Sequence, residues 1–157
     1  MRRILAFAIA SAICSVSAVS QASAQAPALV GKWNAEWELG RMVENGEVTA
    51  IRANGVISVE ASGDSLLATI QVTKRSDNRP PAPNVVTLGG RMSARGATFV
   101  QKQTVRLNMN GEEQTREVTV TWTLNAEGDK LNGSMAREMP FVSEAPAPSE
   151  ITGTRIP

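Results

Sequence analysis

The stretch GDSLLATI at residues 63–70 decides the fold, because the chain repeats it as GDKLNGSM at residues 128–135. A similar ending follows each copy, GGRM at residues 89–92 and GTRI at residues 153–156. Three apolar positions before the first copy also correspond to three before the second: Ile57 to Trp122, Val59 to Leu124 and Ala61 to Ala126. An internal repeat of this kind predicts two halves of one architecture and leaves the chemistry open.

Apolar and polar residues alternate with period two around the repeat, between turns rich in Gly, Asn and Asp. This alternation is typical of half-buried antiparallel strands. Eight strands are predicted, at residues 32–39, 56–61, 66–74, 85–92, 97–109, 113–125, 131–139 and 150–156. The repeat maps the second to fourth strands onto the sixth to eighth. By extension the first strand maps onto the fifth, which places Trp33 near the position of Phe99.

Two four-stranded meanders in tandem predict an all-β fold, an eight-stranded antiparallel up-and-down β-barrel made of two four-strand halves. Closing the sheet removes the two edges that an open sheet would expose. A two-sheet sandwich with the same strand order is the alternative. A barrel of the outer membrane is excluded, because the outward faces carry Lys, Glu and Thr and the chain has few aromatic residues.

A meander places successive connections at opposite ends of the barrel. One end, which we call the closed end, holds the short connections at residues 62–65, 93–96 and 126–130 and the start of the first strand. The other end, the mouth, holds the connections at residues 40–55, 75–84, 110–112 and 140–149, and three of these are long. Long loops on one rim of a rigid scaffold commonly form a binding site. The alternative is that they are insertions on a solid barrel.

The first 24 residues are predicted to be a secretory signal peptide. Arg2 and Arg3 precede an apolar stretch at residues 4–13 that is too short to span a bilayer, and cleavage is expected after Ala24. We therefore expect a periplasmic or secreted protein with a single β-barrel domain at residues 25–157. No later segment is apolar enough to cross a membrane as a helix, so the mature chain is not expected to span one.

The composition after cleavage excludes most catalytic chemistry. The chain has no His or Tyr, and its one cysteine, Cys14, leaves with the signal peptide. Thiolate and imidazole nucleophiles and nearly all zinc, copper and haem ligands are therefore absent, so we expect no enzyme activity, metal or cofactor. Losing Arg2 and Arg3 turns 16 basic and 15 acidic side chains into 14 and 15, and no basic stripe for nucleic acid remains.

Gly31-Lys32-Trp33 resembles the G-x-W signature of lipocalins and of the wider calycin group. The resemblance implies that Trp33, with Gly31 before it, fills the closed end, and that Arg155 near the end of the last strand packs across Trp33. The chain is also similar to small secreted bacterial proteins of unassigned function that begin with G-x-W, carry G-D-x-L-x-G-[ST] and end in I-T-G-T-R. The second lipocalin motif and the C-terminal helix are missing, so no ligand residues carry over.

The inward faces of the predicted strands are mainly apolar but include polar side chains. Five residues are predicted to bind a ligand: Trp37, Gln101, Gln103, Trp122 and Arg137. Arg116 is also placed inward, and an inward arginine needs an acid, water or a ligand as its partner. Small inward residues leave space or match the taper of the barrel: Ala35, Ala61, Ala68, Gly133 and Gly153. The structural alternative is that the polar residues bond one another or lie at a wet rim, and that both tryptophans are plain core.

These observations favour a secreted, non-catalytic barrel that binds a small apolar or amphipathic molecule through its mouth. The alternative is a protein-interaction or structural module of the cell envelope with a solid core and no ligand. The acidic pairs Glu36/Glu38 and Glu112/Glu113 are interpreted as solvated charges, because the first lies on an outer strand face and the second in a hairpin.

Overall fold

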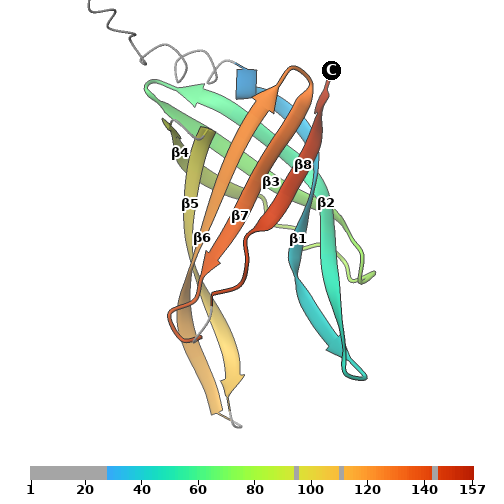
Figure 1. Cartoon of the computed structure of the whole chain (residues 1–157). Coiled ribbons are helices and arrows are strands. Elements are labelled where there is room, and N and C mark those ends of the chain that lie inside the picture. Colours follow the sequence, from blue (N-terminus) through green and yellow to red (C-terminus); the bar gives the residue numbers. More distant parts are fainter. Residues whose placement is uncertain (1–27, 94–95, 110–111, 143–144) are drawn as a thin grey trace, which may run out of the picture.

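The computed structural model describes residues 28–93, 96–109, 112–142 and 145–157, so the predicted signal peptide lies outside the described residues. Eight strands follow one another: β1 (Gly31–Glu44), β2 (Glu47–Ser62), β3 (Ser65–Arg75), β4 (Val86–Ser93), β5 (Gly96–Met109), β6 (Glu112–Glu127), β7 (Lys130–Glu138) and β8 (Ser149–Ile156). Each strand pairs with the next, and β1 pairs antiparallel with β8, which closes the barrel (Figure 1). The predicted up-and-down barrel is confirmed, and the sandwich is excluded.

The period-two pattern places the core as predicted. Along β3, Leu66, Ala68 and Ile70 are buried, while the residues between them are exposed or partly exposed. Along β6 the buried positions alternate in the same way with threonines on the outside. Burying one large aliphatic side chain contributes about 1.5–3 kcal/mol, so the alternation alone fixes which face of each strand points inward.

The sequence repeat corresponds to the two halves of the barrel. Trp33 pairs with Ile57 in the first half, and Phe99 pairs with Trp122 in the second. Since Ile57 and Trp122 are equivalent in the repeat, Trp33 and Phe99 occupy equivalent positions. Both side chains are fully buried.

The ends of the two halves correspond with a shift of one residue from the sequence alignment. Leu66 pairs with Gly90, and its equivalent Leu131 pairs with Gly153. Gly90, rather than Gly89, therefore matches Gly153. The alignment of GGRM with GTRI was therefore wrong by one position. Of the two adjacent glycines, Gly90 faces the core and Gly89 faces outward.

The two halves separate toward the mouth. β4 pairs with β5 only from Gly90 to Ser93, and β1 pairs with β8 no further than Trp37. Beyond these pairs, β1–β2 and β5–β6 continue as two hairpin arms, one at residues 38–52 and one formed by residues 104–109 and 112–117 (Figure 1). The barrel is therefore fully closed near Trp33 and opens along two seams, one between β1 and β8 and one between β4 and β5.

The prediction of a long loop at residues 40–55 was wrong. β1 and β2 run on to a two-residue turn at Asn45 and Gly46, whose φ angles of 53° and 83° are typical of a type I′ hairpin turn. The polar alternation of this segment belongs to an arm that leaves the barrel and buries little. The other long connections at the mouth, residues 76–85 and the β7–β8 connection, are present.

A short helical segment at Ala28 and Leu29 precedes β1. Leu29 is fully buried and covers the closed end, a role that its sequence context did not indicate. Among the described residues, no helix has the length and apolar character needed to cross a bilayer.

Candidate functional site

An interior cavity of about 350 Å³ lies at the mouth end of the barrel, between its two halves. This volume falls within the range of ligand pockets, which runs from about 300 to 1,000 Å³. The cavity is lined by Trp37, Leu39, Ile70, Val72, Ala82, Asn84, Val86, Gln101, Gln103, Val120, Trp122, Met135 and Arg137. Its walls are therefore mostly apolar, with a few polar groups among them.

All five residues predicted to bind a ligand line this one cavity. Strand register explains why: Gln101 on β5 pairs with Val120 on β6, which pairs with Arg137 on β7. Residues of one row point to the same face of the sheet. Gln103 lies one step toward the mouth from this row, and Trp122 one step toward the closed end.

Trp37 and Trp122 meet across the interior as a T-shaped pair, with ring centroids 5.5 Å apart and an angle of 74° between the ring planes. They form the floor of the cavity above the packed core. The indole Nε1 of Trp122 is the only buried polar atom without a hydrogen-bond partner among the side chains that the structure describes. Leaving such a donor unpaired costs about 1–3 kcal/mol.

Arg137, on β7, reaches β1 across the mouth end of the seam between β1 and β8. Its Nη2 donates hydrogen bonds to the carbonyl oxygens of Glu38 at 3.2 Å and Leu39 at 2.6 Å, just beyond the last β1–β8 pair. Burial lowers the pKa of the guanidinium from its usual value, although the Glu38 carboxylate opposes that shift. The side chain remains a cation because arginine titrates far above neutral pH.

A second hollow, the side cleft, lies on the other side of Arg137. It measures about 340 Å³ and is lined by Glu38, Leu39, Gly40, Arg41, Arg137, Met139, Pro146, Ala147 and Ser149. Arg137 and Leu39 line both the side cleft and the interior cavity. These two residues therefore form the partition between the solvent at this seam and the barrel interior.

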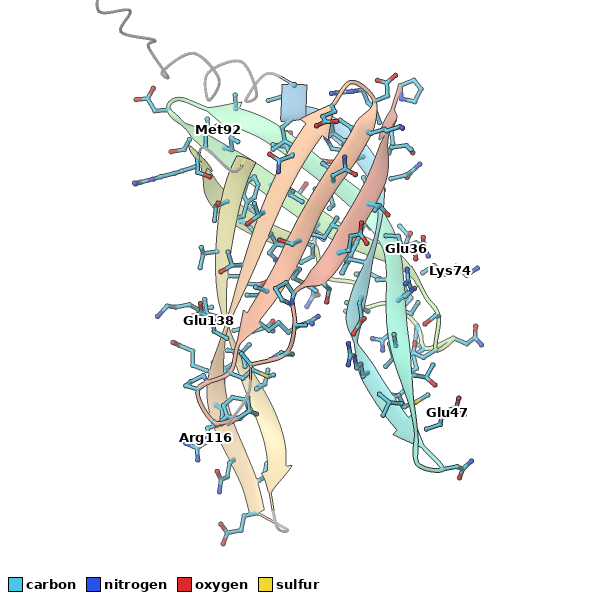
Figure 2. All side chains as sticks on the ribbon, viewed as in Figure 1. Glu36, Glu47, Lys74, Met92, Arg116 and Glu138 are labelled. Carbon is cyan, nitrogen blue, oxygen red and sulfur yellow. The ribbon has the colours of Figure 1, made fainter. Side chains whose placement is uncertain are left out.

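Two inward placements were wrong. Arg116 is exposed on the β5–β6 arm, where its Nη2 donates to Gln114 at 2.6 Å (Figure 2). The parity was correct, but β6 has left the barrel at this height, so no interior exists for the side chain to enter. Ala61 is exposed because β2 extends past the closed end before the turn at Gly63.

The acidic pair on β1 forms surface ion pairs. Glu36 lies 2.6 Å from Arg52 on β2, and Glu38 lies 3.1 Å from Arg41. Both arginines are mostly exposed, so each pair contributes about 0–1 kcal/mol. Neither carboxylate lines the interior cavity.

The closed end is built around Trp33. The Cζ of Arg155 lies 4.1 Å from the centroid of the indole, and the indole Nε1 donates to the Leu29 carbonyl at 2.9 Å. Arg155 also donates to the carbonyls of Ala28 and Val30. Gly31 has a φ of +136°, and a Cβ there would press against the Arg155 guanidinium, so this position of the G-x-W motif requires glycine.

The connection from β3 to β4 forms part of the mouth and is held by Asp77. This carboxylate accepts two hydrogen bonds from Arg75, at 2.9 and 2.6 Å, and one from the Arg79 backbone. The hydrogen bonds from Arg75 lower the pKa of Asp77 below its usual value. The same connection contributes Ala82 and Asn84 to the interior cavity.

We expect Asp77→Asn to destabilise the protein at neutral pH and to matter less in acid. The lowered folded-state pKa means that the ionised carboxylate stabilises the fold above the unfolded value of about 3.9, and that this stabilisation is lost as pH falls through the folded value. Urea unfolding from pH 7 to pH 2.5 should show the wild type and variant converging below about pH 4. Arg75→Gln should reproduce the loss, and a constant gap at all pH values would contradict the role of Asp77.

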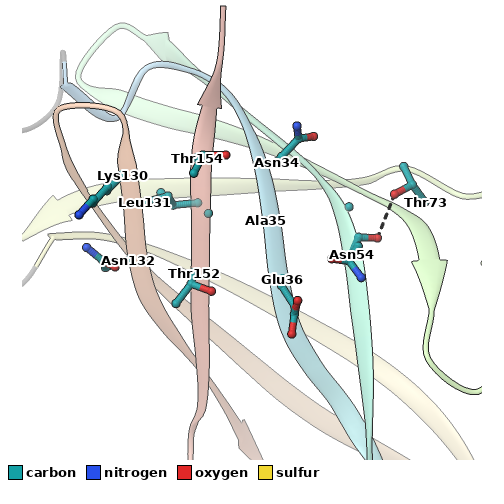
Figure 3. A pocket seen from close by; sticks show the side chains of 12 residues that line it. Asn34, Ala35, Glu36, Asn54, Thr73, Lys130, Leu131, Asn132, Thr152 and Thr154 are labelled. Carbon is teal, nitrogen blue, oxygen red and sulfur yellow. Dashed lines mark hydrogen bonds between the residues drawn. The ribbon is translucent and has the colours of Figure 1, made fainter.

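A further depression, of about 480 Å³, lies on the outer surface across β7, β8, β1, β2 and β3 (Figure 3). Its rim is formed by polar side chains such as Asn34, Asn54 and Thr152, and Thr73 donates to the Asn54 carbonyl at 3.1 Å. These side chains are exposed and face outward. Among the described residues, no group of three or more His, Cys, Asp or Glu side chains could hold a metal ion.

Fold and cavity together define a closed eight-stranded antiparallel β-barrel with a hollow, mostly apolar mouth half. Comparison of the chain with models of protein families, with curated proteins and with solved structures gives no match.

Proposed function

We propose that this protein binds a small apolar or amphipathic molecule, without catalysis, in the interior cavity of the barrel. The observation that carries the proposal is the cavity of about 350 Å³ between Trp37, Trp122 and Arg137. Apolar walls with a few polar groups are the usual composition of small-molecule sites. The proposal involves no metal or cofactor, in keeping with the absence of His and of cysteine after residue 14.

The proposal extends to the type of barrel and its compartment. We propose a lipocalin-like, calycin-like protein of the small secreted bacterial type, exported to the periplasm or beyond after cleavage near Ala24. Support comes from the G-x-W motif at Gly31 to Trp33 and from the stacking of Arg155 on Trp33 at the closed end. The charged and apolar pattern of the first 24 residues supports export.

A second candidate function is a protein-interaction module of the cell envelope. It is favoured by the two hairpin arms, whose outer strand edges have no partner strand in the described part of the chain. Unpaired edges are templates for an added strand. If the arms bind a partner, shortening the arm at residues 38–52 so that only the pairs Glu38–Arg52 and Gly40–Ile51 remain should abolish partner binding. The interior cavity should remain in place.

Titration with 1-N-phenylnaphthylamine, a neutral apolar fluorescent probe, tests the primary proposal. Trp37 and Trp122 line the cavity, so a probe bound there should accept excitation energy from both. We expect saturable binding with one probe per chain. Absence of saturable binding would contradict the proposal.

A further inference from the structure

The positive charge in the interior cavity is not balanced by an acidic residue among the described residues that line it. Of the described residues that line the cavity, none is Asp or Glu, and Arg137 is the one charged residue. The indole N–H of Trp122 has no hydrogen-bond partner among the described residues, but it is fully buried, so the cavity is not offered this donor. The cavity therefore presents one cation and three neutral amide side chains, Asn84, Gln101 and Gln103, in otherwise apolar surroundings.

Arg137 has free hydrogen-bonding capacity toward a ligand. Its two hydrogen bonds both come from Nη2 and both go to backbone carbonyls. None of the ion pairs formed within the described residues includes Arg137. The Glu38 carboxylate, which opposes the lowering of the Arg137 pKa by burial, forms its ion pair with Arg41 at 3.1 Å. The Nε–H of Arg137 and the two N–H groups of its Nη1 remain, and each can donate a charge-assisted hydrogen bond to a carboxylate oxygen.

The carbonyl contacts of Arg137 hold the guanidinium in place without neutralising it. No carboxylate of the described residues lies within ion-pair distance of this half-buried cation, so it carries a desolvation cost that an anion brought by the ligand would offset. Since Arg137 also lines the side cleft, a head group bound there stays near solvent while the rest of the ligand occupies the interior. A ligand with one anionic head group and an apolar body fits this arrangement of a charged opening and an apolar interior.

Trp122 lies close enough to serve the same ligand. Val120 pairs with Arg137 and Trp122 follows two residues later on the same face, so the two side chains start from diagonal positions about 7–8 Å apart. Its indole ring therefore forms the wall of the cavity next to the guanidinium, further inside the barrel.

Resting on the proposed function, we propose that the natural ligand is an apolar monocarboxylate, and that Arg137 binds its carboxylate at the mouth end of the seam between β1 and β8. The interior receives the apolar body, against Trp37 and the aliphatic side chains of β3 and β6.

The test compares cis-parinaric acid with its methyl ester, two fluorescent probes that share one apolar body and differ in the charge of the head. We expect the wild type to bind the acid about tenfold or more tightly than the ester at pH 8, because a charge-assisted hydrogen bond is gained. Arg137→Gln should remove this preference and leave ester affinity nearly unchanged. Arg137→Lys, which keeps the charge but has fewer donors, should retain part of this preference.

Controls separate the site from general effects. Arg116→Gln removes an exposed arginine of the neighbouring arm and should change neither affinity. If Arg137→Gln does not fold, Arg137→Met, which keeps an apolar stem and removes the charge, takes its place and should likewise remove the preference for the acid. Equal affinity of the wild type for acid and ester would overturn the inference and leave the proposed function standing. Failure to bind either probe would overturn both.

Discussion

Trp33→Ala is expected to lower the free energy of unfolding by about 3–5 kcal/mol, the range for deleting a large buried aromatic side chain. Trp33 is fully buried at the closed end, where β1 pairs with both β2 and β8. Its loss removes the support beneath Leu29 and the ring on which Arg155 stacks. Urea denaturation followed by far-ultraviolet circular dichroism measures the change.

A double-mutant cycle with Arg155→Met isolates the stacking contribution. A cation over an aromatic ring contributes about 0.5–2 kcal/mol, so the two substitutions together should cost less than the sum of their separate effects. Trp33→Phe, which keeps most of the ring, is the matched control and should cost less than Trp33→Ala. A loss below about 1 kcal/mol for Trp33→Ala would contradict the view that the closed end carries the stability of the barrel.

Gly90→Ala is expected to destabilise the protein by about 1–3 kcal/mol, the usual cost of overpacking a core. Gly90 pairs with Phe99, and a Cβ at Gly90 would overlap the ring of Phe99, which is fully buried. The backbone at this pair joins the two halves of the barrel, so neither strand can easily move away.

The neighbouring Gly89 provides the control for this substitution. A Cβ at Gly89 would meet nothing within 4 Å, because this residue faces outward. We therefore expect Gly89→Ala to be neutral or to stabilise the protein by up to about 1 kcal/mol through the unfolded state. Thermal unfolding of the two variants gives the comparison, and equal effects would contradict the assignment of Gly90 to the inner face.

The barrel and its inward faces are predictable because one physical rule, the alternation of side chains along a strand, determines both. That rule alone places five residues on the inward faces of their strands, and register then brings them to one cavity: Trp37, Gln101, Gln103, Trp122 and Arg137. The rule does not state where a strand leaves the barrel. Arg116 has the parity of an inward residue and lies outside for that reason.

Asn-Gly dipeptides do not identify turns reliably in the sequence of this chain. Asn54-Gly55 has the composition of a turn but lies within β2 at a register shift. A Cβ at Gly55 would collide with the Gln71 carbonyl and lie 2.7 Å from Trp37, so glycine permits close approach there. Asn45-Gly46 has the same composition and does form a turn. Local sequence does not separate the two cases, because the difference lies in tertiary packing.

The partners of Arg137 could not be predicted from the sequence. They are backbone carbonyls on a strand 98 and 99 residues away along the chain, and a carbonyl has no signature in the sequence. The role of Leu29 was missed for a similar reason, since it precedes the first strand and shows no periodicity.

Filling the interior cavity tests the central claim most directly. Val120 is buried and lies in the row between Gln101 and Arg137, so Val120→Trp should occupy the space of a ligand. Thr121→Trp adds the same ring on the outer face of β6 and is the matched control. Val86→Trp fills the cavity from β4 and serves if Val120→Trp does not fold.

The measurement is the titration of all three proteins with 1-N-phenylnaphthylamine, after thermal unfolding has shown that each is folded. We expect the wild type and Thr121→Trp to bind one probe per chain with equal affinity, and the cavity-filled variant to bind at least about tenfold more weakly. Equal binding by the cavity-filled variant, or no saturable binding by the wild type, would contradict the assignment of the barrel interior as the ligand site.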